Sequence, residues 1–261
     1  EAMVSETLKN CDDGELYLED RKSETIVLDD NKIKSSNYNS DKGYGFRAVT
    51  DEIIAYSHSN EISKESLKKS SDNLKDTLKS KKGNYNHHIP KTNNKFYKNI
   101  NPIENKTFNS KLDLLNNVNS YLRSKGSIVN QVTANFLGEH KSIEIIRSDK
   151  EVLKDDRPLV RFNVSVVLEK NGKKETGVYG VGGRQGYDDY LRNDNWKKVC
   201  DEAFRIAHVN LDSRPAPAGE MKVVLGPGWP AILIHEAIGH GLEGDFNRKK
   251  ISAFHNLMGE K

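Results

Sequence analysis

The stretch Val160-Arg161-Phe162-Asn163-Val164-Ser165-Val166-Val167-Leu168, followed shortly by Asn171-Gly172, decides the fold. Apolar side chains occupy every second position of the first segment, which is the period of a strand with one buried face. Asn171-Gly172 is the strongest hairpin signal in the chain, because both residues accept positive φ angles. We therefore predict an antiparallel hairpin whose second strand returns through residues 178–181.

The same two-residue period occurs on the N-terminal side of this hairpin. Residues 128–136 alternate between apolar and polar side chains, and Gly138-Glu139 is predicted to turn the chain so that residues 143–145 run back. Further short strands, separated by charged or polar turns, are predicted at residues 16–18, 25–28, 43–49 and 53–56.

Three segments have the apolar spacing of amphipathic helices. Ser63 is the predicted N-cap of the first, Ser110 with Asp113 resembles a capping pair for the second, and the third is predicted to begin near Asn193 or Asp194. Their apolar positions are Leu67, Leu74 and Leu78; Leu112, Leu115, Val118 and Leu122; and Trp196, Val199, Cys200, Ala203, Ile206 and Ala207.

Hairpins and helices mix without regular βαβ alternation, which predicts an α+β fold of mixed antiparallel sheets with packed helices. We expect an N-terminal α+β domain over residues 1–213, with a flexible Asn/Lys/Pro-rich loop at about 82–106. The Pro-rich residues 214–219 would connect it to a second domain that begins within residues 214–261 and is incomplete there. In that part, residues 221–225 are predicted to form a short buried strand, and a helix opens at residues 231–234.

The composition argues against several classes of protein. Lys and Arg number 41 against 38 Asp and Glu, a net charge of +3, and the basic residues are spread out, so no direct nucleic-acid binding is expected. No apolar run is long enough to span a membrane, and residues 1–10 lack a signal pattern. Two distant cysteines, Cys11 and Cys200, favour a reducing cytoplasm over a disulfide framework.

The predicted helix near the C-terminus carries His235-Glu236-Ala237-Ile238-Gly239-His240. A catalytic zinc ion needs imidazole or carboxylate ligands and an open position for water. Two nearby histidines supply part of that shell, and a glutamate beside the first can take a proton from the bound water and pass it to a leaving amine. We therefore interpret His235 and His240 as zinc ligands and Glu236 as the catalytic base of a hydrolase.

The spacing of these histidines places a condition on the helix. They lie at positions i and i+5, so on a regular helix their side chains would diverge by roughly 140°. They can converge only if a π-bulge widens the turn or if the helix breaks, and Gly239, Gly241 and Gly244 make a break inexpensive. The alternative is a buried helix in which this combination arises by chance, for which the apolar lead-in at residues 232–234 is equally typical.

A longer stretch resembles a known family. Residues 224–230, Val-Leu-Gly-Pro-Gly-Trp-Pro, and residues 235–249, from His-Glu-Ala-Ile-Gly-His to Phe-Asn-Arg-Lys, resemble the signature of the TldD/PmbA metalloprotease family, in particular of its TldD-type subunits. The upstream segments at residues 157–161, 182–184 and 216–219 are similar as well. The resemblance covers nearly all of the chain but only about the N-terminal half of the family.

The resemblance implies a zinc metallopeptidase subunit that cleaves short or unfolded peptides in a closed chamber, paired with a related non-catalytic PmbA/TldE-like subunit. His235 and His240 match the family's two histidine ligands, and Glu236 matches its base. The family's link to DNA gyrase raises nucleic-acid binding as a third class, for which the chain has no motif. Residues 214–261 would be the start of the C-terminal metalloprotease domain.

The family's third zinc ligand is a cysteine in the C-terminal domain, to which nothing in these residues corresponds. Cys200 lies on the apolar face of a predicted helix and Cys11 before the first strand, while His255 has nothing to orient it. We therefore expect weak zinc binding and inefficient hydrolysis by these 261 residues alone. A catalytically inactive fragment that acts as a partner- or peptide-binding module is the alternative function.

Overall fold

The computed structural model describes residues 1–79, 82–84, 96–191 and 194–260. Residues 1–213 and 214–261 form two compact units, which are described separately below. The central part of the loop predicted at about 82–106 lies outside the described residues, as do His87 and His88 within it. Its described C-terminal part, residues 96–106, contains turns but no regular helix or strand.

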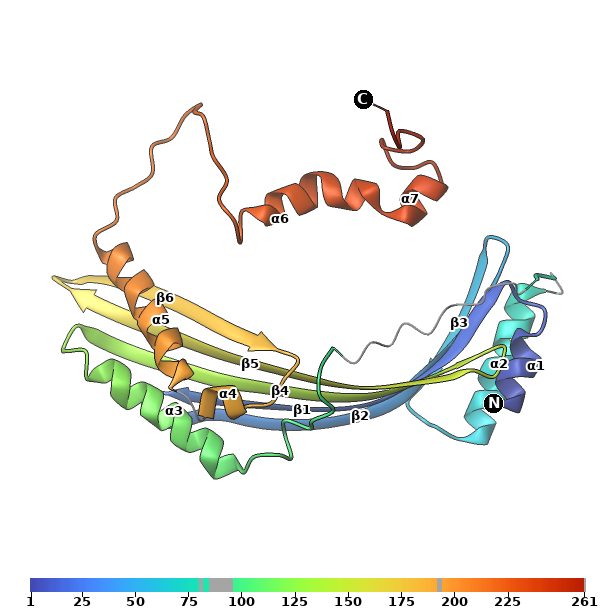
Figure 1. Cartoon of the computed structure of the whole chain (residues 1–261), viewed down its shortest axis with the longest axis horizontal. Helices are drawn as coiled ribbons and strands as arrows, with labels where there is room; N and C mark the ends of the chain where they lie inside the picture. The colour runs from blue at the N-terminus through green and yellow to red at the C-terminus, as the bar shows by residue number, and fades with distance from the viewer. Residues whose placement is uncertain (80–81, 85–95, 192–193, 261) are drawn as a thin grey trace. The chain divides into compact units, whose positions relative to one another are not determined.

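The first unit is built on one six-stranded antiparallel sheet with the order β3-β2-β1-β4-β5-β6 (Figure 1). The strands are β1 (Asp13–Asp29), β2 (Lys32–Thr50), β3 (Ile53–Ser59), β4 (Val129–Arg147), β5 (Val152–Lys170) and β6 (Lys173–Gly183). The predicted hairpin joins β5 to β6, and Asn171 and Gly172 have the positive φ angles of 53° and 78° that its turn requires. Together with the packed helices, this sheet confirms the α+β class.

Two strands each run unbroken through a stretch where the sequence pattern predicted separate pieces. The predicted strands at residues 16–18 and 25–28 are parts of the single 17-residue strand β1, whose charged middle stays extended because both neighbouring strands pair with it. The turn predicted at Gly138-Glu139 is also wrong, since β4 continues through Gly138. A Cβ atom at Gly138 would lie 2.3 Å from the hydroxyl of Tyr187, so the glycine makes room for a buried ring instead of turning the chain.

All helices of the first unit pack on the same face of the sheet. They are α1 (Ala2–Leu8), α2 (Lys64–Leu78), α3 (Phe108–Arg123), α4 (Asp188–Leu191) and α5 (Asn195–Leu211). Along β1, the buried apolar residues Leu16, Ile26 and Leu28 share one face, because side chains two apart point to the same side. Leu16 belongs to a core with α1 and α2, and the other two belong to a core with α3, α4 and α5. The opposite side of the sheet, here named the open face, is covered by none of these helices.

The helix boundaries confirm one predicted cap, confirm the position of a second, and correct the third. Ser63 caps α2, since its hydroxyl accepts a hydrogen bond from the Ser66 amide. Asp194 precedes α5, as predicted, but makes no side-chain cap. The predicted Ser110 capping pair is wrong, because α3 begins earlier, and Thr107 accepts the bond from the Ser110 amide.

The helix α3 is tied to the sheet by a buried ion pair. Lys111, 1% exposed, donates to both carboxylate oxygens of Glu24 on β1, at 3.0 and 2.6 Å, and to the carbonyl of Ile103 at 3.0 Å. Its ammonium group also lies 5.1 Å from the centre of the Tyr187 ring. A buried cation is tolerated only when such partners replace its water shell.

The second unit, residues 214–261, contains short helical turns. They are α6 (Ala231–Ile234), a π turn (His235–Gly239), a 3-10 turn (His240–Leu242) and α7 (Gly244–Arg248). The buried strand predicted at residues 221–225 is wrong: these residues are exposed and have no regular structure, because no described strand lies beside them to complete a ladder. Across the described residues of both units, no helix is long and apolar enough to cross a membrane.

We expect Glu24→Ala to lower the free energy of unfolding of the first unit by about 3 kcal/mol, because it leaves the Lys111 ammonium buried without a counter-charge. Urea denaturation followed by circular dichroism measures the change. Glu144→Ala is the matched control, since Glu144 pairs with the exposed Lys154 and its loss should cost less than about 1 kcal/mol. Equal effects of the two substitutions would contradict the assigned role of the buried pair.

Gly177 on β6 sets how closely α5 approaches the sheet. A Cβ atom there would lie 2.0 Å from the Ala203 carbonyl oxygen and 2.5 Å from the Ala207 amide. Gly177→Ala should therefore push α5 outward and destabilise the unit by about 2 kcal/mol, measured by the same denaturation. At Gly183 the nearest atoms would be 3.8 Å away, so Gly183→Ala should be neutral within about 0.5 kcal/mol.

Candidate metal centre

The backbone between the two predicted ligands forms a π turn. Residues His235–Gly239 are π-helical, and the His240 amide donates to the His235 carbonyl, five residues back. This bond widens the turn enough for side chains five apart to share a side of the helix. Of the two possibilities that the spacing left open, the structure has the widened turn and not a break.

The widened turn brings three metal-binding side chains together. The rings of His235 and His240 lie with their centroids 4.7 Å apart at an angle of 67°. Ligand atoms of these two histidines and of Glu236 all lie within 4.8 Å of one another. Two imidazoles and a carboxylate are the donors of many hydrolytic metal sites, so these residues could hold a metal ion.

Gly239 is not needed for the reason that the sequence suggested. Its φ and ψ angles of −56° and −48° are ordinary helical values, so the turn does not need a glycine for its backbone. A Cβ atom at this position would lie 3.4 Å from the His235 Nδ1 atom, an ordinary contact distance. The space beside the His235 ring therefore does not require a glycine either.

Glu243 orients the second histidine, a role that the sequence analysis missed. The Nδ1 atom of His240 lies 2.6 Å from the Glu243 carboxylate, and its Nε2 atom lies 3.5 Å from that of Glu236. Through this hydrogen bond, Glu243 raises the pKa of His240, with a further contribution from the charge of Glu236. A carboxylate on Nδ1 favours the tautomer whose Nε2 is free to bind a metal. The i+3 spacing on one helical face was the signal that could have identified it.

The other residues considered as ligands lie apart from this cluster. Where the structure describes the chain, His235, Glu236 and His240 form the only such group of three, and His255 instead lies 2.9 Å from the Ser252 carbonyl. Cys11 and Cys200 are free and buried in the first unit. Burial raises the pKa of the Cys200 thiol to about 12 and also raises that of Cys11, which disfavours the thiolate that a metal needs.

Comparison with protein families gives two matches to one family. Residues 14–79 match domain 1 of the PmbA/TldA metallopeptidases, and residues 101–211 match their central domain. Together these matches span more than half of the chain, and both fall within the first structural unit.

Relatives from two bacteria are similar along nearly the whole chain. A metalloprotease TldD homolog of Buchnera aphidicola (from Acyrthosiphon pisum) is 40% identical over 263 residues, and one of Haemophilus influenzae is 38% identical over 263 residues. Each alignment covers 97% of this chain and 54% of the relative. The chain therefore spans about half the length of the curated relatives that it matches.

Solved structures share the fold at low sequence identity. TldE from Thermococcus kodakarensis superposes with a TM-score of 0.69 at 13% identity, covering 98% of this chain and 57% of that one. A Bacteroides thetaiotaomicron protein described as a proposed modulator of DNA gyrase gives a TM-score of 0.72 at 14% identity, covering 98% and 60%. At such identities the likeness concerns the fold alone. The family matches and the TldD relatives, taken together, show that this chain belongs to the PmbA/TldD metallopeptidase family.

Proposed function

We propose that the chain is part of a TldD-type zinc metallopeptidase that cleaves short or unfolded peptides. The observation that carries the proposal is the convergence of His235, Glu236 and His240 through the π turn. Their family resemblance supports it, and so do the relatives named as metalloproteases. A non-catalytic binding module would have no need for two imidazoles and a carboxylate held within 4.8 Å of one another.

Each of these side chains has a distinct role in the proposed reaction. His235 and His240 would hold the zinc ion through one ring nitrogen each. Zinc, when bound, would polarise the peptide carbonyl and activate a water molecule. Glu236 would accept a proton from that water and deliver it to the nitrogen of the leaving amine. Glu243 would keep the His240 ring in its orientation and tautomer throughout.

The third ligand is proposed to come from outside these 261 residues. The family resemblance implies a cysteine of the C-terminal domain, and both cysteines of this chain are buried in the other structural unit. With only the two histidine ligands, the 261 residues should hold zinc weakly. We also propose a cytoplasmic location, which suits two free thiols, and pairing with a PmbA/TldE-like subunit, to which the structural likeness to TldE lends support.

Zinc titration of the purified chain tests the proposed ligands. We expect one zinc ion per chain, bound weakly, with binding lost in His235→Ala and in His240→Ala, because each removes an imidazole. His255→Ala is the control and should bind zinc like the unaltered chain. Competition against a zinc-chelating dye measures the affinity, and binding that persists in both ligand variants would reject the assignment.

Glu243→Gln tests how His240 is positioned. The amide can still accept the Nδ1–H hydrogen bond but lacks the negative charge, so zinc affinity should fall by about tenfold. Asp245→Asn is a matched control on the neighbouring helix, since Asp245 pairs with Arg248 and Lys249. If both variants bind zinc equally well, Glu243 does not act on the metal site.

Hydrolysis of a fluorogenic peptide by the purified chain tests whether the third ligand is required. We expect no hydrolysis above the background rate, because two histidines position the metal poorly. If the chain instead cleaves the peptide and Glu236→Gln abolishes that cleavage, the 261 residues already form a complete catalytic site.

A further inference from the structure

One arginine at the end of the sheet near β5 and β6 has no acidic partner among the described residues. On the open face, Arg157 binds Asp155 at 2.6 Å, while Arg21 and Lys141 both lie near Glu139. Arg161 on β5 is exposed, and within the described parts of the chain no carboxylate lies at ion-pair distance from it. Arg184, which follows β6, is also exposed, but its charge acts on the Asp155 carboxylate. Arg161 therefore carries a positive charge that no described carboxylate pairs with.

The side chain of Arg161 is held in place by a chain of hydrogen bonds across two strands. Its Nε donates to the Asn163 side-chain oxygen at 2.8 Å, and the Asn163 amide donates to the Asn135 side chain on β4 at 2.9 Å. Because Nε is used, the two terminal nitrogens are the part of the guanidinium left for a ligand. Their parallel N–H groups match the two oxygens of a carboxylate.

On the open face, the part of β6 beside Arg161 consists of glycines. In the register of β5 and β6, Gly182 lies opposite Arg161 and Gly180 opposite Asn163, so both glycines are on the open face. A Cβ atom at Gly180 would lie 2.1 Å from the Asn163 side-chain oxygen and 3.3 Å from the Arg161 Nη2 atom. These glycines leave a bare strip of backbone next to the guanidinium, which an extended chain can approach closely.

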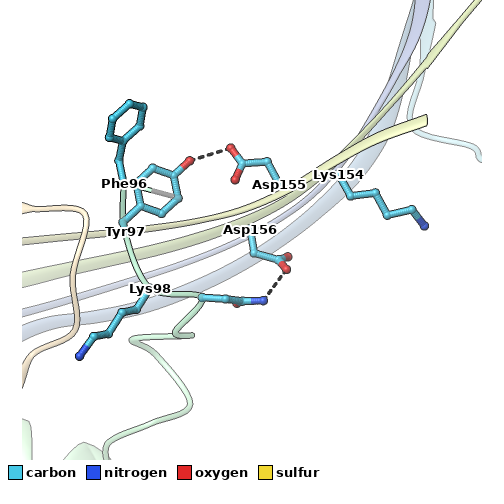
Figure 2. Close-up of a pocket in the computed structure, with 7 residues that line it drawn as sticks. Phe96, Tyr97, Lys98, Lys154, Asp155 and Asp156 are labelled. Atoms are coloured by element: carbon cyan, nitrogen blue, oxygen red, sulfur yellow. Dashed lines mark hydrogen bonds between the residues drawn. The ribbon is translucent and has the colours of Figure 1, made fainter. Parts of the chain in front are cut away.

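The acidic side chains beside Tyr97 and Asn99 already have hydrogen-bond donors. Figure 2 shows the Tyr97 hydroxyl pointing to Asp155, to which it donates at 2.6 Å. The Asn99 amide donates to Asp156, also at 2.6 Å. The guanidinium of Arg184 lies 5.4 Å from the centre of the same Tyr97 ring. Asp155 therefore has two donors, Tyr97 and Arg157, and the charge of Arg184 acts on it as well, whereas Arg161 makes no ion pair with it.

We propose that Arg161 binds the C-terminal carboxylate of a peptide whose last residues lie along the Gly180–Gly182 strip. A chain terminus fits better than an acidic side chain, because the bare strip accommodates peptide backbone up to the carboxylate. The inference rests on the proposed peptidase function, since it assumes that peptides are the ligands. It assigns the open face of the sheet to recognition of the substrate's end.

Fluorescence anisotropy of two peptides tests the proposal. The probes are an amino-terminally fluorescein-labelled hexapeptide of alternating Gly and Ala and the same peptide as its C-terminal amide, in buffer freed of metal by a chelating resin. We expect the acid to bind about fivefold more tightly than the amide, the upper range for an exposed ion pair. Arg161→Gln should abolish this preference, and Gly180→Ala should weaken it by displacing Asn163.

Arg205→Gln is the matched control, because Arg205 is exposed on α5 and paired with Glu202, and it should keep the full preference. Equal binding of acid and amide, or a preference that survives Arg161→Gln, would overturn the proposal. So would displacement of the peptide by inorganic phosphate at lower concentration than by acetate, which would indicate a general anion site. The anisotropy assay contains no metal, so its outcome does not depend on the outcome of the zinc titration.

Discussion

One-sided burial of long antiparallel strands is the constraint on which the rest of the first unit depends. A strand alternates its side chains between two faces, and here β1, β4 and β5 place most of their buried apolar residues on one of them. Both groups of helices pack there, one at each end, because that face carries the apolar side chains of the two cores (Figure 1). The open face is the consequence, and its polar side chains can serve binding without disturbing a core.

This arrangement buries charged strand residues where a helix packs over them, and burying a charge is unfavourable. The middle of β1 is too polar to form a core, and Glu24 there is covered by α3. The fold resolves the conflict by placing Lys111 on the helix and the Ile103 carbonyl beside it, so that Glu24 and Lys111 each have a buried partner. Glycines at close approaches, such as Gly177 under α5, let the two layers come together.

The metal centre depends on a local constraint of a different kind. Its geometry follows from one hydrogen bond, in which the His240 amide reaches the carbonyl five residues back. That bond belongs to the backbone of the helix, so it needs no contact with the first unit to bring the imidazoles together. Glu243 adds the orientation of one ring. The exposed site is thus organised within nine residues of sequence.

The sequence by itself determined these features: the β5–β6 hairpin, the Ser63 cap, the α+β class and the condition that the turn between His235 and His240 be either widened or broken. These features follow from the hydrophobic periodicity and the spacing of residues that lie close together in the sequence. Only the tertiary structure decided that β1 and β4 run unbroken, because polar residues and Gly138 stay extended when strands pair on both sides. It likewise decided that Arg161 faces away from the helices beside a glycine strip, since strand register joins residues that lie far apart in the chain.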